Sequence, residues 1–174
     1  HEMNEWGKAI AFFKQLLEKH SQSLFREESF YRLADAYYQQ GQHLEADQIL
    51  SEYREEFQQL SNAVRVIERQ AQNMLKLGRL QKAHTLLLKE VPIHPDFRLV
   101  ALHLDILNQL QDDLGILELA IRTYNYDFLS DQRGLISYHQ ANSLFRMKRF
   151  EESLSSYLEA QRNPPPDRLR FIKY

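Results

Sequence analysis

A glycine followed five positions later by an alanine recurs along the chain at a constant interval. The pattern occurs three times, 37 residues apart, as Gly41 and Ala46, Gly78 and Ala83, and Gly115 and Ala120. A fixed interval between about 20 and 50 residues is typical of repeat proteins, in which each unit packs mainly against its neighbours. The chain is therefore predicted to be a solenoid with an extended surface, and binding is the function to look for.

The composition fits a folded repeat array. The 174 residues are 43% hydrophobic and 26% charged, with a net charge of −2. Such a chain can bury a sizeable core, and its small net charge argues against general binding of polyanions. The absence of Cys excludes disulfides and thiolate metal sites. No apolar run approaches the roughly 20 residues of a membrane-spanning helix.

The repeated unit is predicted to be a pair of helices. Apolar residues three or four positions apart form a first helical stripe of Phe30, Leu33, Ala34 and Tyr37. A second stripe runs from Leu44 to Tyr53. Between them Gly41 is expected to form the turn, because glycine adopts a positive φ without steric cost. The unit is therefore a helical hairpin.

These residues resemble the tetratricopeptide repeat (TPR) family, whose repeat has about 34 residues. The best unit matches the family's order of large, small, aromatic, glycine and alanine positions with Phe30, Leu33, Ala34, Tyr37, Gly41, Ala46 and Leu50. The next unit matches with Ile67, Ala71, Met74, Gly78, Leu80, Ala83, Leu87 and Pro95. There Gln70 replaces the expected leucine. The resemblance implies an all-α, right-handed α-solenoid of antiparallel helical hairpins.

The whole chain, residues 1–174, is predicted to be one TPR-like array. About four hairpins are expected, at residues 24–57, 61–92, 96–128 and 130–163. Residues 3–20 are expected to be the second helix of a preceding unit. Residues 166–174 are expected to begin a following helix.

The third and fourth hairpins depart from the pattern. Counting from Gly115 places Leu104, Leu107, Asn108 and Gln111 on the inner stripe of the third hairpin. A family-length step from Gly78 would choose Ala101, Leu104, Asp105 and Asn108 instead, and the first choice is preferred because it keeps Gly115 and Ala120 together. In the fourth hairpin Lys148 and Ser153 replace the glycine and the alanine.

Motifs for catalysis or metal binding are weak. His94-Pro95-Asp96 matches the tripeptide of J-domain cochaperones, but Asp96 is better placed to cap the next helix. The histidines show no metal-ligand spacing, and no nucleophile motif or phosphate-binding loop is present. No catalytic residue, metal or cofactor is therefore predicted, and the chain is not expected to be an enzyme.

In the TPR family the first helices of successive hairpins line a concave groove. The resemblance therefore implies a candidate partner-binding groove formed by Tyr31, Asp35, Tyr38, Glu68, Gln72, Asp105, Gln109, Asp112, Tyr138, Asn142 and Phe145. Acids lie in the middle of this set and aromatics at both ends. Such a groove suits an extended or helical peptide with basic and apolar side chains.

The function expected from these features is a protein–protein interaction scaffold or adaptor with a protein or peptide partner. The alternative is a regulatory or substrate-recruiting repeat region of a larger enzyme whose catalytic domain lies outside this chain. An RNA-reading repeat of the pentatricopeptide type would need a basic groove to neutralise phosphates. Because the predicted groove is acidic, no nucleic-acid partner is expected.

Overall fold

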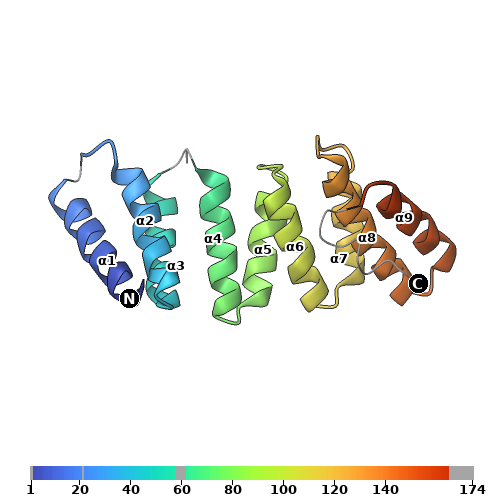
Figure 1. Cartoon of the computed structure of the whole chain (residues 1–174), viewed down its shortest axis with the longest axis horizontal. Helices are drawn as coiled ribbons and strands as arrows, with labels where there is room; N and C mark the ends of the chain where they lie inside the picture. Colours follow the sequence, from blue (N-terminus) through green and yellow to red (C-terminus); the bar gives the residue numbers. More distant parts are fainter. Residues whose placement is uncertain (1, 21, 58–61, 165–174) are drawn as a thin grey trace. The chain divides into compact units, whose positions relative to one another are not determined.

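The chain folds entirely into helices where its structure is described. The computed structural model describes residues 2–20, 22–57 and 62–164, and these ranges form nine α-helices and no strand (Figure 1). The helices divide into two compact units, His1–Leu86 and Leu87–Tyr174. The predicted all-α class is confirmed. The expected helix at 166–174 lies outside the described residues.

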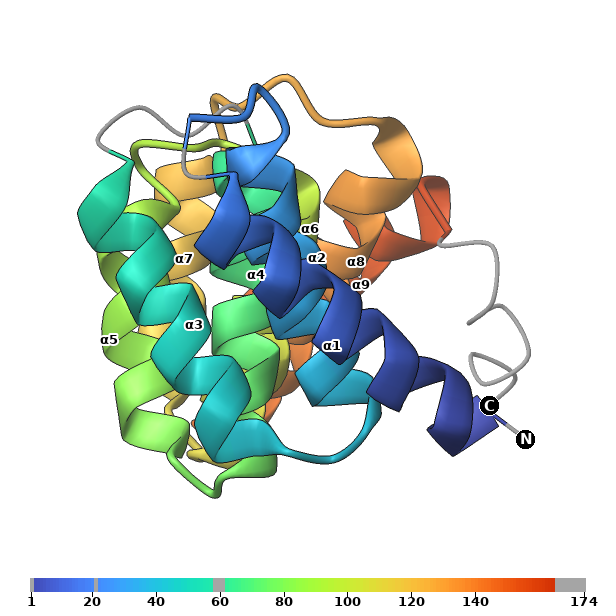
Figure 2. The same ribbon diagram turned by 90° about the vertical axis from the view of Figure 1, so that its left-hand side faces the viewer.

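Unit 1 is built around its second helix. It contains α1 (Glu2–Lys19), α2 (Arg26–Gln39), α3 (His43–Glu56) and α4 (Ala63–Lys76), together with the start of α5 (Leu80–Glu90). Helix α2 packs against α1, α3 and α4, and Figure 2, which faces unit 1, shows α1 and α3 in front of it. Buried side chains of α2 belong to two apolar clusters. Phe30 is part of one cluster and Leu33 is part of the other.

Unit 2 is centred on α8. It contains the end of α5, then α6 (Phe97–Gln109), α7 (Asp113–Thr123), α8 (Ser130–Arg146) and α9 (Phe150–Arg162). Helix α8 packs against α6, α7 and α9. The Asp96 carboxylate accepts a hydrogen bond of 2.9 Å from the backbone N–H of Arg98 at the start of α6. The predicted capping role of Asp96 is therefore confirmed.

Four helices end in the same left-handed turn. A positive φ occurs at Gly41 (79°), Gly78 (69°), Gln111 (56°) and Lys148 (62°). The next residue donates its N–H to the carbonyl oxygen five residues earlier, from Gln42 to Tyr37, Arg79 to Met74, Asp112 to Leu107 and Arg149 to Leu144, over 2.8 to 2.9 Å. This bond belongs to the Schellman motif, which satisfies the last carbonyls of a helix. Two of the four turns form without glycine.

The prediction that Gly115 forms the third turn is wrong. Gly115 lies within α7, and Gln111 forms the turn. A Cβ at Gly115 would stand 2.7 Å from Cδ2 of Leu107 and 2.5 Å from Oδ2 of Asp112, so this glycine permits close packing instead. Counted from Gln111, the buried stripe of α6 is Val100, His103, Leu104 and Leu107. This stripe replaces both registers considered from the sequence.

The residue five positions after each turn residue packs inside its hairpin. Ala46, Ala83, Ile116 and Ser153 occupy this place, and all four are buried. Ser153 satisfies its hydroxyl by donating to the carbonyl oxygen of Ala141 over 2.9 Å. Ala120, which the repeated pattern pairs with Ala46 and Ala83, lies instead at the position equivalent to Leu50, nine residues after its turn residue. Alanine therefore occupies two of these four buried positions and is not required there.

Candidate partner-binding site

The predicted groove residues lie on helices of both units. Unit 1 carries Tyr31, Asp35 and Tyr38 on α2 and Glu68 and Gln72 on α4, and unit 2 carries Asp105 and Gln109 on α6 and Tyr138, Asn142 and Phe145 on α8. Asp112 lies on none of these helices. Its carboxylate accepts from the N–H of Gly115 over 2.9 Å and caps α7. Asp112 therefore caps α7, and its role in a groove stays a prediction.

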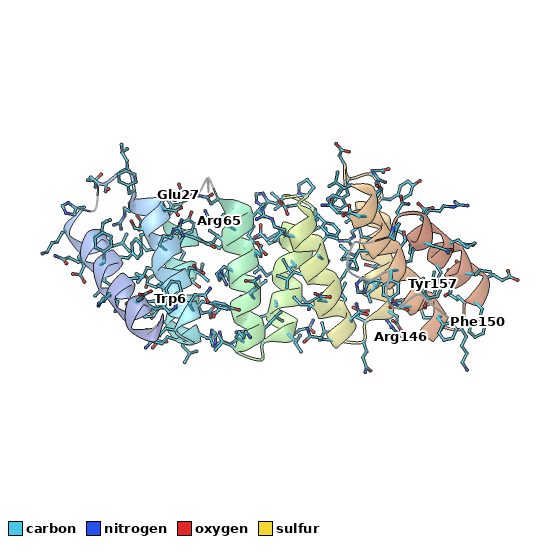
Figure 3. The ribbon with its side chains drawn as sticks, viewed as in Figure 1. Trp6, Glu27, Arg65, Arg146, Phe150 and Tyr157 are labelled. Carbon is cyan, nitrogen blue, oxygen red and sulfur yellow. The ribbon has the colours of Figure 1, made fainter. Side chains whose placement is uncertain are left out.

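Two arginines of α4 stack on two tyrosines of α2. The guanidinium carbon of Arg65 lies 4.2 Å from the centre of the Tyr31 ring, and that of Arg69 lies 4.3 Å from the centre of the Tyr38 ring. Arg65 is labelled in Figure 3. A guanidinium over an aromatic ring contributes about 0.5 to 2 kcal/mol, depending on how far it is removed from water. These contacts hold α4 against α2.

The carboxylates of this face are already paired. Asp35 and Arg69 form a salt bridge of 2.7 Å, with only 19% and 18% of their side chains exposed. Glu28 lies 2.6 Å from Arg32 and 3.8 Å from Arg65. The α2–α4 face of unit 1 is therefore a set of ion pairs and stacked rings. It offers little uncompensated negative charge to a basic peptide.

The middle of the predicted groove is also less acidic than expected. Asp105 and Gln109 are exposed on α6, but Asp112 does not join them because it caps α7. The neighbouring Asp113 forms an ion pair with Arg146 of α8, and its Oδ1 accepts from Nε of Arg146 over 2.8 Å. Of the acids in this part of unit 2, Asp112 and Asp113 therefore already have partners.

Aromatic side chains gather where α8 meets α9. The rings of Tyr138 and Tyr157 lie 6.3 Å apart, and the Tyr157 hydroxyl donates to Oδ1 of Asn142 over 2.6 Å. The rings of Phe145 and Phe150 meet edge to face at 5.4 Å. Burial raises the pKa of the Tyr157 hydroxyl above its usual value. Tyr138, Asn142, Phe145, Phe150 and Tyr157 are called the aromatic surface below.

The aromatic surface is open. Phe145 is 57% exposed and Phe150 is 56% exposed, and Figure 3 shows Phe150 and Tyr157 on α9 with Arg146 nearby on α8. Phe150 is the second residue after the turn residue Lys148. His43 is the equivalent residue in unit 1, because it is the second residue after Gly41. His43 is covered by α4, since its Nδ1 lies 3.0 Å from Oδ1 of Asn73 and its carbonyl accepts from Nδ2 over 2.7 Å.

Sequence reasoning missed three residues of these surfaces. Arg69, Phe150 and Tyr157 were not assigned to the groove. The turn spacing offered a signal for Phe150, because counting two positions past Lys148 leads to it. The stacking of Arg69 on Tyr38 had no such signal, since it depends on how α4 docks on α2.

Other site types find little support in the described ranges. No group of three or more His, Asp or Glu side chains there is placed to hold a metal ion. None of the helices in the same ranges is both long enough and apolar enough to cross a membrane.

Comparisons with known proteins agree with the helical-repeat architecture. Residues 28–59, which contain α3 and most of α2, match the family model for the tetratricopeptide repeat. No curated protein sequence matches the chain.

Two solved structures share the fold at 17% sequence identity. One, described as "MamA MSR-1 C2", is matched over 92% of this chain and 88% of its own, with a TM-score of 0.63. The other is YrrB, described as "a TPR protein with an unusual peptide-binding site", matched over 95% of this chain and 81% of its own, with a TM-score of 0.66. The chain is an all-α helical repeat protein. More specifically, it is a TPR-like solenoid.

Proposed function

We propose that the chain is a protein-interaction scaffold that binds a peptide or helix of a partner protein on the aromatic surface of unit 2. The observation that carries this proposal is the exposed Phe145–Phe150 pair beside the Tyr138–Tyr157 pair. Aromatic side chains contribute most of the binding energy at protein interfaces, because they bury a large area and lose little conformational entropy.

Asn142 supplies the polar contact of the proposed interface. Its Oδ1 is occupied by the Tyr157 hydroxyl, which leaves its amide N–H groups facing no other partner within the described part of the chain. These N–H groups are suited to donate to a peptide carbonyl. Tyr157 thereby fixes the orientation of the Asn142 side chain, and a fixed donor reduces the entropy lost on binding.

The partner proposed here is mainly apolar. The predicted preference for basic side chains depended on Asp35, Asp105 and Asp112, of which Asp35 pairs with Arg69 and Asp112 caps α7. Beside the aromatic surface, Arg146 pairs with Asp113 and Arg149 pairs with Glu152, so these charges are balanced. The similarity to YrrB, whose description names a peptide-binding site, supports the choice of a peptide as partner.

Selection from a random peptide library displayed on phage tests this proposal. Peptides enriched on the wild-type chain are measured by calorimetry against Phe145→Ala/Phe150→Ala. Loss of two central aromatic contacts should weaken binding about tenfold or more. The control is Phe12→Ala in α1, since Phe12 is also exposed, at 59%, and this variant should bind as the wild type does.

Circular dichroism first establishes that both variants keep their helices. Enriched peptides that bind the double variant with unchanged affinity would show that the aromatic surface is not the site. Failure to enrich any peptide in repeated selections would contradict the peptide-binding function itself.

A further inference from the structure

A second candidate site lies on a different face of α8. It is a hollow of about 520 Å³ between α7, α8 and α9, lined by Ala120, Ile121, Tyr124, Asn125, Ser137, Gln140, Ser155, Ser156 and Glu159. The volume falls within the usual range for pockets that bind small groups. None of its lining residues belongs to the aromatic surface. We call it the α7–α9 hollow.

The hollow lies where α8 carries a small side chain at a position that is large and apolar in the other hairpins. In three of the four hairpins, the residue eleven positions before the turn residue is large and buried. These residues are Phe30, Ile67 and Val100. In the hairpin of α8 and α9 the same position is Ser137. Eight positions before the turn, α2 has the buried Leu33, α4 and α6 have the buried Gln70 and His103, and α8 has the half-buried Gln140. Neither side chain fills the space between α7 and α9.

The walls of the hollow are mixed in character. Ile121 of α7 and Tyr124, which follows the last residue of α7, form an apolar side and are 71% and 74% exposed. Ser137 and Gln140 supply a hydroxyl and a carboxamide, which make no side-chain hydrogen bond to the described residues. Glu159 is engaged by Asn163, whose Nδ2 donates to it over 3.0 Å, and by Arg162 at 3.7 Å. The hollow therefore favours a neutral group.

We propose that the α7–α9 hollow binds the side chain of a tyrosine from a partner protein. An aromatic ring would pack against Ile121 and Tyr124, and its hydroxyl would reach Gln140 and Ser137. A hydroxyl both donates and accepts, and a carboxamide offers both functions in return. A group with an apolar body and a polar tip is what a pocket with one apolar wall and one polar wall selects.

Nuclear magnetic resonance titration of the whole chain tests this assignment. The probes are N-acetyl-tyrosinamide and N-acetyl-phenylalaninamide, which differ by the hydroxyl alone. We expect both to shift the backbone amide signals of Ile121, Tyr124, Ser137 and Gln140. The tyrosine probe should bind about threefold to tenfold more tightly, which is the contribution of one neutral hydrogen bond.

Three variants sharpen the test. Ser137→Val/Gln140→Leu gives α8 residues like Val100 and Leu33, and filling the hollow should abolish the shifts from both probes. Tyr124→Ala removes an exposed wall without touching the core, so it should weaken binding even if the filled variant does not fold. Gln161→Leu, an exposed change on α9, is the control and should bind both probes normally.

Each outcome decides the proposal. Signals that do not shift in the wild-type chain, or that shift equally in the filled and wild-type chains, overturn it. Equal affinity for the two probes overturns the role of the hydroxyl. Binding that survives both the filled variant and Tyr124→Ala places the probes elsewhere.

Discussion

The backbone carbonyl oxygen of Asn163 lies where a side chain on Gly134 would begin. A Cβ built on Gly134 stands 1.5 Å from this oxygen and 2.7 Å from the carbonyl carbon. Gly134 is buried in the first part of α8, and Asn163 is the residue at which α9 ends. The absence of a side chain at position 134 therefore allows the end of α9 to pack directly on α8.

Gly134→Ala is expected to destabilise unit 2. The blocking atoms belong to the backbone, so relief requires moving the end of α9 and not only a side-chain rotation. Overpacking of this kind costs about 1 to 3 kcal/mol. Thermal unfolding followed by circular dichroism measures the loss, and each kcal/mol corresponds to roughly 2 to 4 °C in a chain of this size.

The matched control is Gly7→Ala in α1. A Cβ there would meet only Nε2 of Gln40, at an ordinary 3.7 Å. Because alanine favours helix over glycine by up to about 1 kcal/mol, this variant should be neutral or slightly more stable. Equal melting temperatures for the two alanine variants would contradict the close approach of Asn163.

Glycine should stabilise the two turns that lack it. Gln111 and Lys148 have φ values of 56° and 62°, a conformation that strains residues with a Cβ by about 1 to 2 kcal/mol. Part of the relief is offset by the greater freedom of glycine in the unfolded chain. Gln111→Gly and Lys148→Gly should therefore each add about 0.5 to 1 kcal/mol to the free energy of unfolding in urea.

The reverse substitutions provide the comparison. Gly41→Ala and Gly78→Ala place a Cβ at φ values of 79° and 69°, and both should lower stability by about 1 kcal/mol. If all four variants changed stability in the same direction, the shared turn geometry would be wrong.

These turns also explain where prediction from the sequence stopped. The fold class followed from apolar stripes such as Phe30 to Tyr37 and from glycine at positions 41 and 78, because both signals reflect local sterics. Gln111 gives no such signal, since glutamine does not favour a positive φ. Gly115 lies within α7 and packs closely on Leu107, so it was a false signal for the position of the turn. The wholly apolar spacing of Val100, Leu104 and Leu107 was the better guide to the register of α6.

The Asp35–Arg69 pair should show measurable coupling. Both side chains are less than one-fifth exposed, so neutralising one leaves a poorly solvated charge. We expect a double-mutant cycle of Asp35→Asn and Arg69→Gln to give a coupling free energy of about 1 to 2 kcal/mol. The exposed pair Arg149 and Glu152 is the control cycle, and its coupling should be close to zero. Comparable values in both cycles would mean that the α2–α4 face is more open to water than the structure indicates.

Tyr53 should make stability depend on pH in the alkaline range. Burial and a hydrogen bond of 2.7 Å to Glu27 raise the pKa of its hydroxyl, so the folded chain holds this proton more tightly than the unfolded chain does. The contribution is therefore complete below the unfolded pKa of about 10 and is lost as pH rises towards the folded pKa.

Denaturant unfolding of Tyr53→Phe at a series of pH values from neutral to alkaline measures this effect. The variant lacks the titrating group, so its stability should fall less steeply above pH of about 10 than that of the wild type. Parallel curves would show that other groups dominate the alkaline transition.

The candidate site was harder to predict than the fold. Tyr138, Asn142 and Phe145 were assigned from their places on the first helix of a hairpin, and whether they bind a partner stays a prediction. Their association with Phe150 and Tyr157 depends on how α9 folds back on α8. The charge of the predicted groove was misjudged because a sequence shows that Asp35 and Asp112 are acidic, but it does not show what they pair with.

The turns at Gln111 and Lys148 have a consequence for how such proteins are recognised. Because the backbone bonds of the turn form without glycine, substitution can erase the residue that marks a repeat while leaving the hairpin folded. An array built in this way can diverge in sequence while its hairpins stay folded, and residues 28–59 of this chain still match the family model. The helical hairpin is then retained after the glycine that would identify it in the sequence has been replaced.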